Sequence, residues 1–106
     1  RIEQILVNLI VNAVDAIGET AGRITISVEP SANGKRVVCA VADTGPGIPP
    51  EQLVQIFEPF FTTKPPERGT GLGLPVAREI VQTYGGNLTV SSELGRGTTF
   101  TFDLPR

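Results

Sequence analysis

Two glycine clusters constrain the fold of this chain more than any other feature. Residues 43–47 (Asp-Thr-Gly-Pro-Gly) follow an apolar, strand-like run, and residues 69–73 (Gly-Thr-Gly-Leu-Gly) open a helix-like pattern. Glycine lets a backbone approach a ligand closely, and a helix N-terminus offers unpaired N–H groups and a positive dipole end to phosphate. Each cluster alone is a weak signal, but together and in this order they predict a nucleotide site.

Length and composition predict one globular domain over residues 1–106. The chain is 40% hydrophobic and 19% charged, which is enough for one small core. Because Arg1 stands inside a helical pattern with no cap residue ahead of it, we expect a fragment of a longer protein. The single cysteine, Cys39, lies in an apolar run, so we expect a core thiol without a chemical role.

Charge and hydropathy exclude two classes of partner. A net charge of -2 gives no general attraction for nucleic acid or anionic membranes, so any phosphate binding must be local. The longest apolar stretches are interrupted well short of the roughly 20 residues that a membrane-spanning helix needs. We therefore expect a soluble domain that binds no nucleic acid and does not insert into a membrane.

The N-terminal segment has the periodicity of a helix with one polar face. Apolar side chains recur at helical spacing from Ile2 to Ile17 and extend most of the way round, which predicts a helix buried on nearly all sides. Polar residues spaced by three or four interrupt this pattern: Gln4, Asn8, Asn12 and Asp15. Two interpretations stay open, because these side chains either hydrogen-bond a neighbouring element or line the nucleotide site and offer amide oxygen to Mg²⁺.

The pattern after this helix predicts the rest of the fold. Period-two alternation predicts a strand over 23–29, and a near-continuous apolar run over 36–42 predicts an interior strand that ends at Asp43. Then follow a short helix over 50–56, a loop over 62–68, a helix over 72–84 and two strands that flank a turn at 95–97. This order predicts an α/β (α+β) two-layer sandwich, with helices on one face of a mixed, largely antiparallel sheet.

Two common phosphate-binding motifs do not fit the second glycine cluster. A Walker loop needs Lys-Ser or Lys-Thr after its last glycine, whereas Gly73 is followed by Leu74 and Pro75. A dinucleotide fingerprint has the spacing G-x-G-x-x-G directly after a strand. The cluster here is G-x-G-x-G and follows a loop, so both motifs are excluded.

Five motifs in a fixed order resemble those of one ATP-binding family. Residues 4–16 resemble its N box, 43–48 its first glycine box, 57–64 its F box, 69–74 its second glycine box and 95–100 its closing glycine box. On these motifs the chain is similar, over essentially its whole length, to the ATP-binding catalytic domain of bacterial two-component sensor histidine kinases. That domain has the Bergerat (GHKL) fold shared with gyrase, Hsp90 and MutL. A short strand usually precedes its N box, so the resemblance implies an N-terminally truncated fold.

The resemblance implies roles for three polar side chains. Asp43 is implied to accept a hydrogen bond from the adenine amino group and to reject guanine, whose carbonyl oxygen would face the carboxylate. Asn12 is implied to hold Mg²⁺ through its amide oxygen, which makes it the expected metal ligand. Asn8, one turn earlier, is implied to reach the phosphates or a metal-bound water. Asn8 and Asn12 are therefore the expected catalytic residues.

The resemblance also assigns ATP contacts to other residues of the motifs. The first glycine box is implied to let the backbone pass the adenine, and the second to form a lid hinge and a phosphate-facing turn. Lys64 and Arg68 either contact phosphate or are simply solvated, and Phe57 is either core or a tie between the lid and its base. The expected ATP-contacting residues are Asn8, Asn12, Asp15, Asp43, Gly45, Gly47, Ile48, Phe57, Lys64, Arg68, Gly69, Thr70, Gly71, Leu72, Gly73, Leu74 and Thr98.

One position separates the branches of this superfamily. Its ATP-hydrolysing members resemble one another in carrying a Glu one helical turn before the Mg²⁺-binding Asn, and this chain has Asn8 there. An amide cannot accept the proton, so transfer of the γ-phosphate to another nucleophile is favoured over hydrolysis. The chain contains no histidine. The resemblance therefore implies a phosphoacceptor histidine on a separate, dimeric helical domain upstream in the same protein and, indirectly, a response regulator.

These observations predict a protein-histidine kinase catalytic domain that binds ATP and Mg²⁺ and is not active alone. The resemblance implies a cytoplasmic domain and leaves membrane anchoring of the full-length protein open. Two alternatives remain: a non-catalytic ATP-binding regulatory module, and an ATPase of the same superfamily. Transfer to a histidine-bearing hairpin would separate the kinase from the regulatory module, and steady ATP turnover would favour the ATPase.

Overall fold

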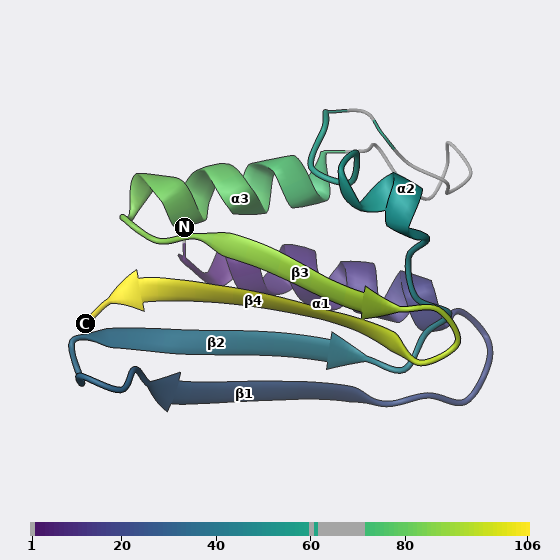
Figure 1. Cartoon of the computed structure of the whole chain (residues 1–106), viewed down its shortest axis with the longest axis horizontal. Coiled ribbons are helices and arrows are strands. Elements are labelled where there is room, and N and C mark those ends of the chain that lie inside the picture. The colour runs from purple at the N-terminus through teal and green to yellow at the C-terminus, as the bar shows by residue number, and fades with distance from the viewer. Residues whose placement is uncertain (1, 60, 62–71) are drawn as a thin grey trace.

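The fold is a layer of helices on one face of an antiparallel sheet (Figure 1). The computed structural model describes residues 2–59, 61 and 72–106. The elements are α1 (Ile2–Ile17), β1 (Ile24–Pro30), β2 (Arg36–Asp43), α2 (Pro50–Leu53), α3 (Gly73–Thr83), β3 (Leu88–Glu93) and β4 (Gly97–Pro105). The predicted loop over 62–68 and most of the second glycine cluster lie outside the described residues.

The four strands lie in the order β1-β2-β4-β3. The predicted two-layer sandwich is confirmed, and β2 is an interior strand as expected. The sheet is not mixed, however, since every strand pair that the structure describes is antiparallel. Short turns join β1 to β2 and β3 to β4, and such turns permit only antiparallel pairing.

The core fills the space between the sheet and the helices α1 and α3. Buried apolar side chains recur every third or fourth residue on both helices and every second residue on the strands, as each geometry requires. The largest fully buried side chains are Phe100, Phe102, Ile5, Leu9, Ile80, Val41 and Val81. Each stabilises the fold by about 1.5–3 kcal/mol relative to exposure to water. Cys39 is a free thiol in this core, as expected.

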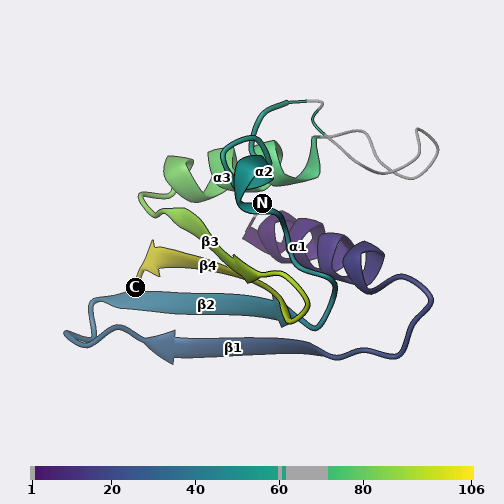
Figure 2. The same cartoon turned by 45° about the vertical axis from the view of Figure 1, so that its right-hand side comes forward.

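Helix α1 is less buried than its sequence predicts. Its core-facing residues are buried, whereas Val7, Val11 and Val14 are about half exposed. The prediction of a helix buried on nearly all sides is therefore wrong. The sheet covers one side of α1 and α3 lies beside it (Figure 2), and two layers cannot enclose a helix completely. No helix among the described residues is both long and apolar enough to cross a bilayer.

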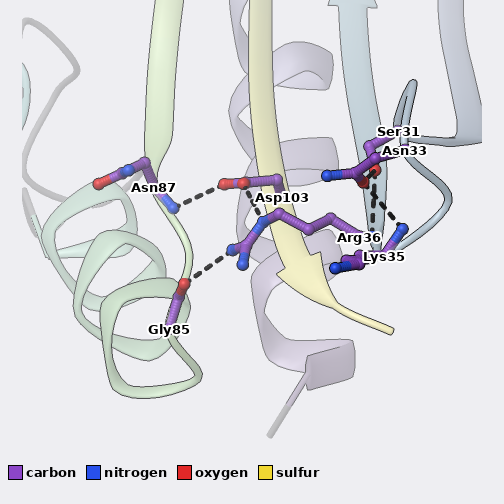
Figure 3. A network of polar contacts seen from close by, with 7 residues as sticks. All are labelled: Ser31, Asn33, Lys35, Arg36, Gly85, Asn87 and Asp103. Carbon is purple, nitrogen blue, oxygen red and sulfur yellow. Dashed lines mark hydrogen bonds and ion pairs between the residues drawn. The ribbon is translucent and has the colours of Figure 1, made fainter.

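Arg36 joins three segments at the end of the sheet where β2 begins (Figure 3). Its Nε donates to Asp103 Oδ2 of β4 at 2.6 Å, and its Nη2 donates to the Gly85 carbonyl after α3 at 2.7 Å. The Asn87 N–H donates to Asp103 Oδ1 at 2.8 Å. This hydrogen bond, with a further contribution from Arg36, lowers the pKa of Asp103. The network fastens the turn between α3 and β3 to the two central strands.

Asp103→Asn should lower stability at neutral pH and much less in acid. The pKa of Asp103 is lower in the folded state than in the unfolded state. The stabilisation of the fold by its carboxylate is therefore complete above the ordinary aspartate pKa of about 3.9, and it is lost as the pH falls through the folded pKa. The carboxylate is partly exposed, so we expect a loss of only about 1 kcal/mol. Urea unfolding of the wild type and of Asp103→Asn, at neutral pH and at a pH below the folded pKa of Asp103, measures the difference in stability. An equal loss of stability at both pH values would contradict this account.

Candidate nucleotide site

Asp43 is a buried carboxylate at the carboxyl end of β2. Its exposed fraction is 6%, and its Oδ1 accepts a hydrogen bond from the Gly45 N–H at 2.8 Å. Burial raises the pKa of Asp43, while backbone hydrogen bonds from Gly45 and Thr98 oppose the rise. The fold therefore holds an acceptor group in a fixed orientation where little water reaches it, an arrangement that is typical of ligand recognition.

The loop after Asp43 fits between α1 and the β3–β4 turn only because it contains glycine. A Cβ atom on Gly45 would lie 3.1 Å from the carbonyl oxygen of Ala16 in α1. Gly47 has φ +84°, and a Cβ atom there would lie 2.5 Å from the Glu93 carbonyl oxygen. The first glycine box is thus clamped between two elements that are distant in sequence.

Ser92 fastens this loop to the sheet, although no sequence motif singles it out. Its Oγ accepts a hydrogen bond from the Ile48 N–H at 2.7 Å and lies 2.9 Å from Thr98 Oγ1 and 3.1 Å from the Gly97 carbonyl. Thr98 is 5% exposed, and its backbone also hydrogen-bonds Asp43. The available signal was a serine at an inward-facing position of β3, which alone does not reveal its partners.

A polar hollow of about 220 Å³ lies at this end of the sheet. It is lined by Asp43, Ser91, Ser92, Glu93, Arg96, Gly97, Thr98 and Thr99. Gly97 has φ +137°, and a Cβ atom there would lie 1.9 Å from the Asp43 carbonyl oxygen. Glycine at this position therefore lets the start of β4 approach the end of β2.

The polar face of α1 meets the start of α3. Asn8, Asn12 and Asp15 are all partly buried on this face. Asn8 Oδ1 accepts a hydrogen bond from Gln4 Nε2 at 2.6 Å, and Asn8 Nδ2 donates to the Gly73 carbonyl at 3.0 Å. The contact with Gly73 shows that Asn8 does hydrogen-bond a neighbouring helix, the first of the two interpretations. Its role toward nucleotide stays a prediction.

Three of the expected contact residues pack against the core: Ile48, Phe57 and Leu74. The Phe57 ring meets the Phe100 ring edge-on, with 6.3 Å between centroids and an interplanar angle of 84°. The Arg78 guanidinium of α3 lies 5.2 Å from the Phe57 centroid. Phe57 therefore connects the segment after α2 to both the sheet and α3.

Leu72 lies immediately before α3 and is 36% exposed. Five expected residues lie outside the described part of the chain: Lys64, Arg68, Gly69, Thr70 and Gly71.

A family profile described as "Histidine kinase-, DNA gyrase B-, and HSP90-like ATPase" matches residues 1–106, the whole chain. The chain belongs to this family. Its relatives include the sensor histidine kinase ZraS of Escherichia coli (strain K12), 48% identical over 105 residues, which covers 99% of this chain and 22% of ZraS. The sensor kinase CckA of Brucella abortus (strain 2308) is 45% identical over 119 residues, which covers 100% of this chain and 12% of CckA. The chain thus spans about a fifth or less of these relatives.

Solved structures of histidine kinases have the same fold as this chain. The nucleotide-free catalytic domain of histidine kinase ThkA matches with a TM-score of 0.82 and 41% identity, covering 98% of this chain and 66% of that one. Full-length ShkA, solved in complex with AMPPNP, matches with a TM-score of 0.83 and 39% identity, covering 96% of this chain and 20% of that one. The predicted histidine kinase family and fold are confirmed.

Asp43→Asn should keep the fold and, at neutral pH, should unfold at the same temperature as the wild type or at a higher one. Because its folded pKa is raised, the ionised carboxylate destabilises the folded state above that pKa, and stability rises as the pH falls through it. Asparagine removes the buried charge and keeps an acceptor oxygen for the Gly45 N–H. Thermal unfolding against pH measures this, and a large loss of stability at neutral pH would contradict it.

Proposed function

We propose that this domain binds Mg·ATP at the end of the sheet beside Asp43 and donates the γ-phosphate to a histidine on a separate domain. The observation that supports this most is the buried, backbone-held carboxylate of Asp43 in a chain of the histidine kinase family. The AMPPNP complex of ShkA and the names of the relatives agree with this proposal. Residues 1–106 then form one catalytic domain of a longer protein.

Asp43 would select adenine. Its ionised carboxylate accepts a hydrogen bond from the adenine amino group, while guanine would place a carbonyl oxygen against it. Gly45 and Thr98 hold the carboxylate through backbone hydrogen bonds, so it cannot turn away from the wrong base without losing them. Leaving a buried polar group unpaired costs about 1–3 kcal/mol, which corresponds to a preference for adenine over guanine of about 5- to 150-fold in affinity.

The polar face of α1 would bind the triphosphate. The amide oxygen of Asn12 is the kind of hard oxygen ligand that suits Mg²⁺, and Asn8 lies one turn away on the same face. Asn8 also contacts the start of α3 through the Gly73 carbonyl. A helix N-terminus offers unpaired N–H groups and a positive dipole end to phosphate. When bound, Mg²⁺ would neutralise phosphate charge, which a domain of net charge -2 does not do by itself.

The side chain of Asn8 favours transfer over hydrolysis. An amide cannot accept a proton from water, so the domain would position ATP and neutralise its charge while the acceptor supplies the nucleophile. With no histidine in the chain, that acceptor belongs to another domain, a dimeric helical one in our proposal. ThkA has been solved in complex with the response regulator TrrA. We infer that the protein containing this domain is linked indirectly to such a regulator. We also infer a cytoplasmic location for this domain.

The chain should bind AMPPNP, a non-hydrolysable ATP analogue, more tightly with Mg²⁺ than without it, and should bind the GTP counterpart weakly. Asp43→Asn should weaken AMPPNP binding by at least about tenfold, since one acceptor is lost to the adenine amino group. Asn12→Ala should remove most of the strengthening by Mg²⁺. Isothermal titration calorimetry measures all three effects.

The matched control for this titration is Asn87→Ala. Asn87 is an exposed asparagine at the other end of the sheet, and its contact with Asp103 is made by its backbone N–H. This variant should bind AMPPNP like the wild type. Absence of AMPPNP binding by the folded wild-type chain would contradict the proposal.

Transfer is tested with radiolabelled ATP and a histidine-bearing helical hairpin of the parent protein. Acid-labile phosphate on the hairpin is the expected result. Binding without transfer would make the domain a regulatory module, and steady ATP turnover by the chain alone would make it an ATPase.

A further inference from the structure

The side-chain amide of Asn8 is held at both ends. Gln4 Nε2 donates to Asn8 Oδ1 at 2.6 Å. The Gly73 carbonyl can only accept, and it contacts Asn8 Nδ2 at 3.0 Å. The Gly73 carbonyl therefore sets the orientation of the amide, and the hydrogen bond from Gln4 holds the oxygen in that orientation. Without such partners, an asparagine amide can turn over and exchange its oxygen and nitrogen.

The orientation of this amide decides which ligand Asn8 can bind. Phosphate oxygens accept hydrogen bonds, whereas Mg²⁺ binds oxygen. Gln4 engages the oxygen of Asn8, and the nitrogen points toward the start of α3. The contact with Gly73 uses one of the two amide hydrogens and leaves the second to donate. Held in this way, Asn8 suits a phosphate oxygen better than a metal ion.

We propose that Gln4 is a positioning residue of the nucleotide site, one that holds the Asn8 side chain in place as a hydrogen-bond donor to nucleotide phosphate and leaves the metal to Asn12. This inference rests on the proposed function and deepens it. It gives the two asparagines of the N box different roles, whereas the sequence alone allowed Asn8 to contact either phosphate or a metal-bound water. Gln4 acts through Asn8 and contacts no ligand itself.

Gln4 contributes little to the fold, which makes the proposal testable. It is exposed on the first turns of α1, and a side-chain pair four residues apart stabilises a helix by only about 0.2–0.5 kcal/mol. Methionine has a similar length and helix propensity but no hydrogen-bonding amide. Gln4→Met should therefore unfold at the same temperature as the wild type and still leave Asn8 oriented by Gly73 alone.

The test is a double-mutant cycle with two ligands, AMPPNP and adenosine, both titrated with Mg²⁺. Gln4→Met should weaken AMPPNP binding about three- to tenfold, the range for one hydrogen bond, and should leave adenosine binding unchanged. In the Asn8→Ala background, Gln4→Met should have no further effect, because the residue through which it acts is gone. A purely structural role would weaken both ligands and persist in that background.

A second variant opposes the orientation of the Asn8 amide. In Gln4→Glu the carboxylate can only accept, so it competes with the Gly73 carbonyl for the Asn8 nitrogen and removes the donor to the Asn8 oxygen. Val7→Glu is the matched control, since it adds the same charge at an exposed position of α1 three residues further along. Gln4→Glu should weaken AMPPNP binding more than Val7→Glu does.

The outcomes distinguish this inference from the proposed function. If the wild-type chain binds AMPPNP but Gln4→Met binds it equally well, or the Gln4→Met effect survives in Asn8→Ala, this inference is overturned and the proposed function stands. If the folded wild-type chain binds no AMPPNP, the proposed function is overturned and this inference with it.

Discussion

The antiparallel pairing of β2 with β4 is the interaction on which the rest of the structure depends. It is the central pair of the sheet and aligns Val41 with Phe100 and Cys39 with Phe102, so it builds the layer on which both long helices pack. The same register places Asp43 opposite Thr98. One pairing thus fixes the core and delivers the carboxylate to the candidate site.

The two ends of this strand pair serve different purposes. At one end, Asp103 is a partly exposed carboxylate whose pKa is lowered by its hydrogen bonds, so its charge stabilises the fold. At the other end, Asp43 is buried and its pKa is raised, so its charge is a cost to the fold. Proteins commonly tolerate such a cost at a ligand site, because the same buried charge gives selectivity. The contrast agrees with the proposed adenine contact.

Sequence periodicity predicted the elements well because each has one apolar face. The strand over 36–42 and the helix over 72–84 agree with β2 and α3 to within a residue at each end. The helix over 50–56 is shorter than predicted, since α2 ends at Leu53 and continues as turns. The burial of α1 was overestimated because apolar side chains indicate what a helix can bury, not how many layers are present to cover it.

The candidate site was only partly predictable, for a physical reason. The family motifs identified Asp43, Asn8 and the glycines, among which Gly47 and Gly97 have a positive φ that only glycine adopts readily. They did not identify Ser92 or the contact between Gln4 and Asn8, because a side chain's hydrogen-bond partner depends on how the elements are placed in space. Such positioning residues emerge from coordinates rather than from patterns.

In our proposal, the sheet end at Asp43 and the junction of α1 with α3 form one nucleotide site. The most direct test is to follow backbone amide signals by NMR while Mg·AMPPNP is added to the ¹⁵N-labelled chain. We expect the signals of Gly45, Thr98 and Gly73 to shift together and to give one dissociation constant. Shifts confined to one of the two regions, or two clearly different constants, would contradict it.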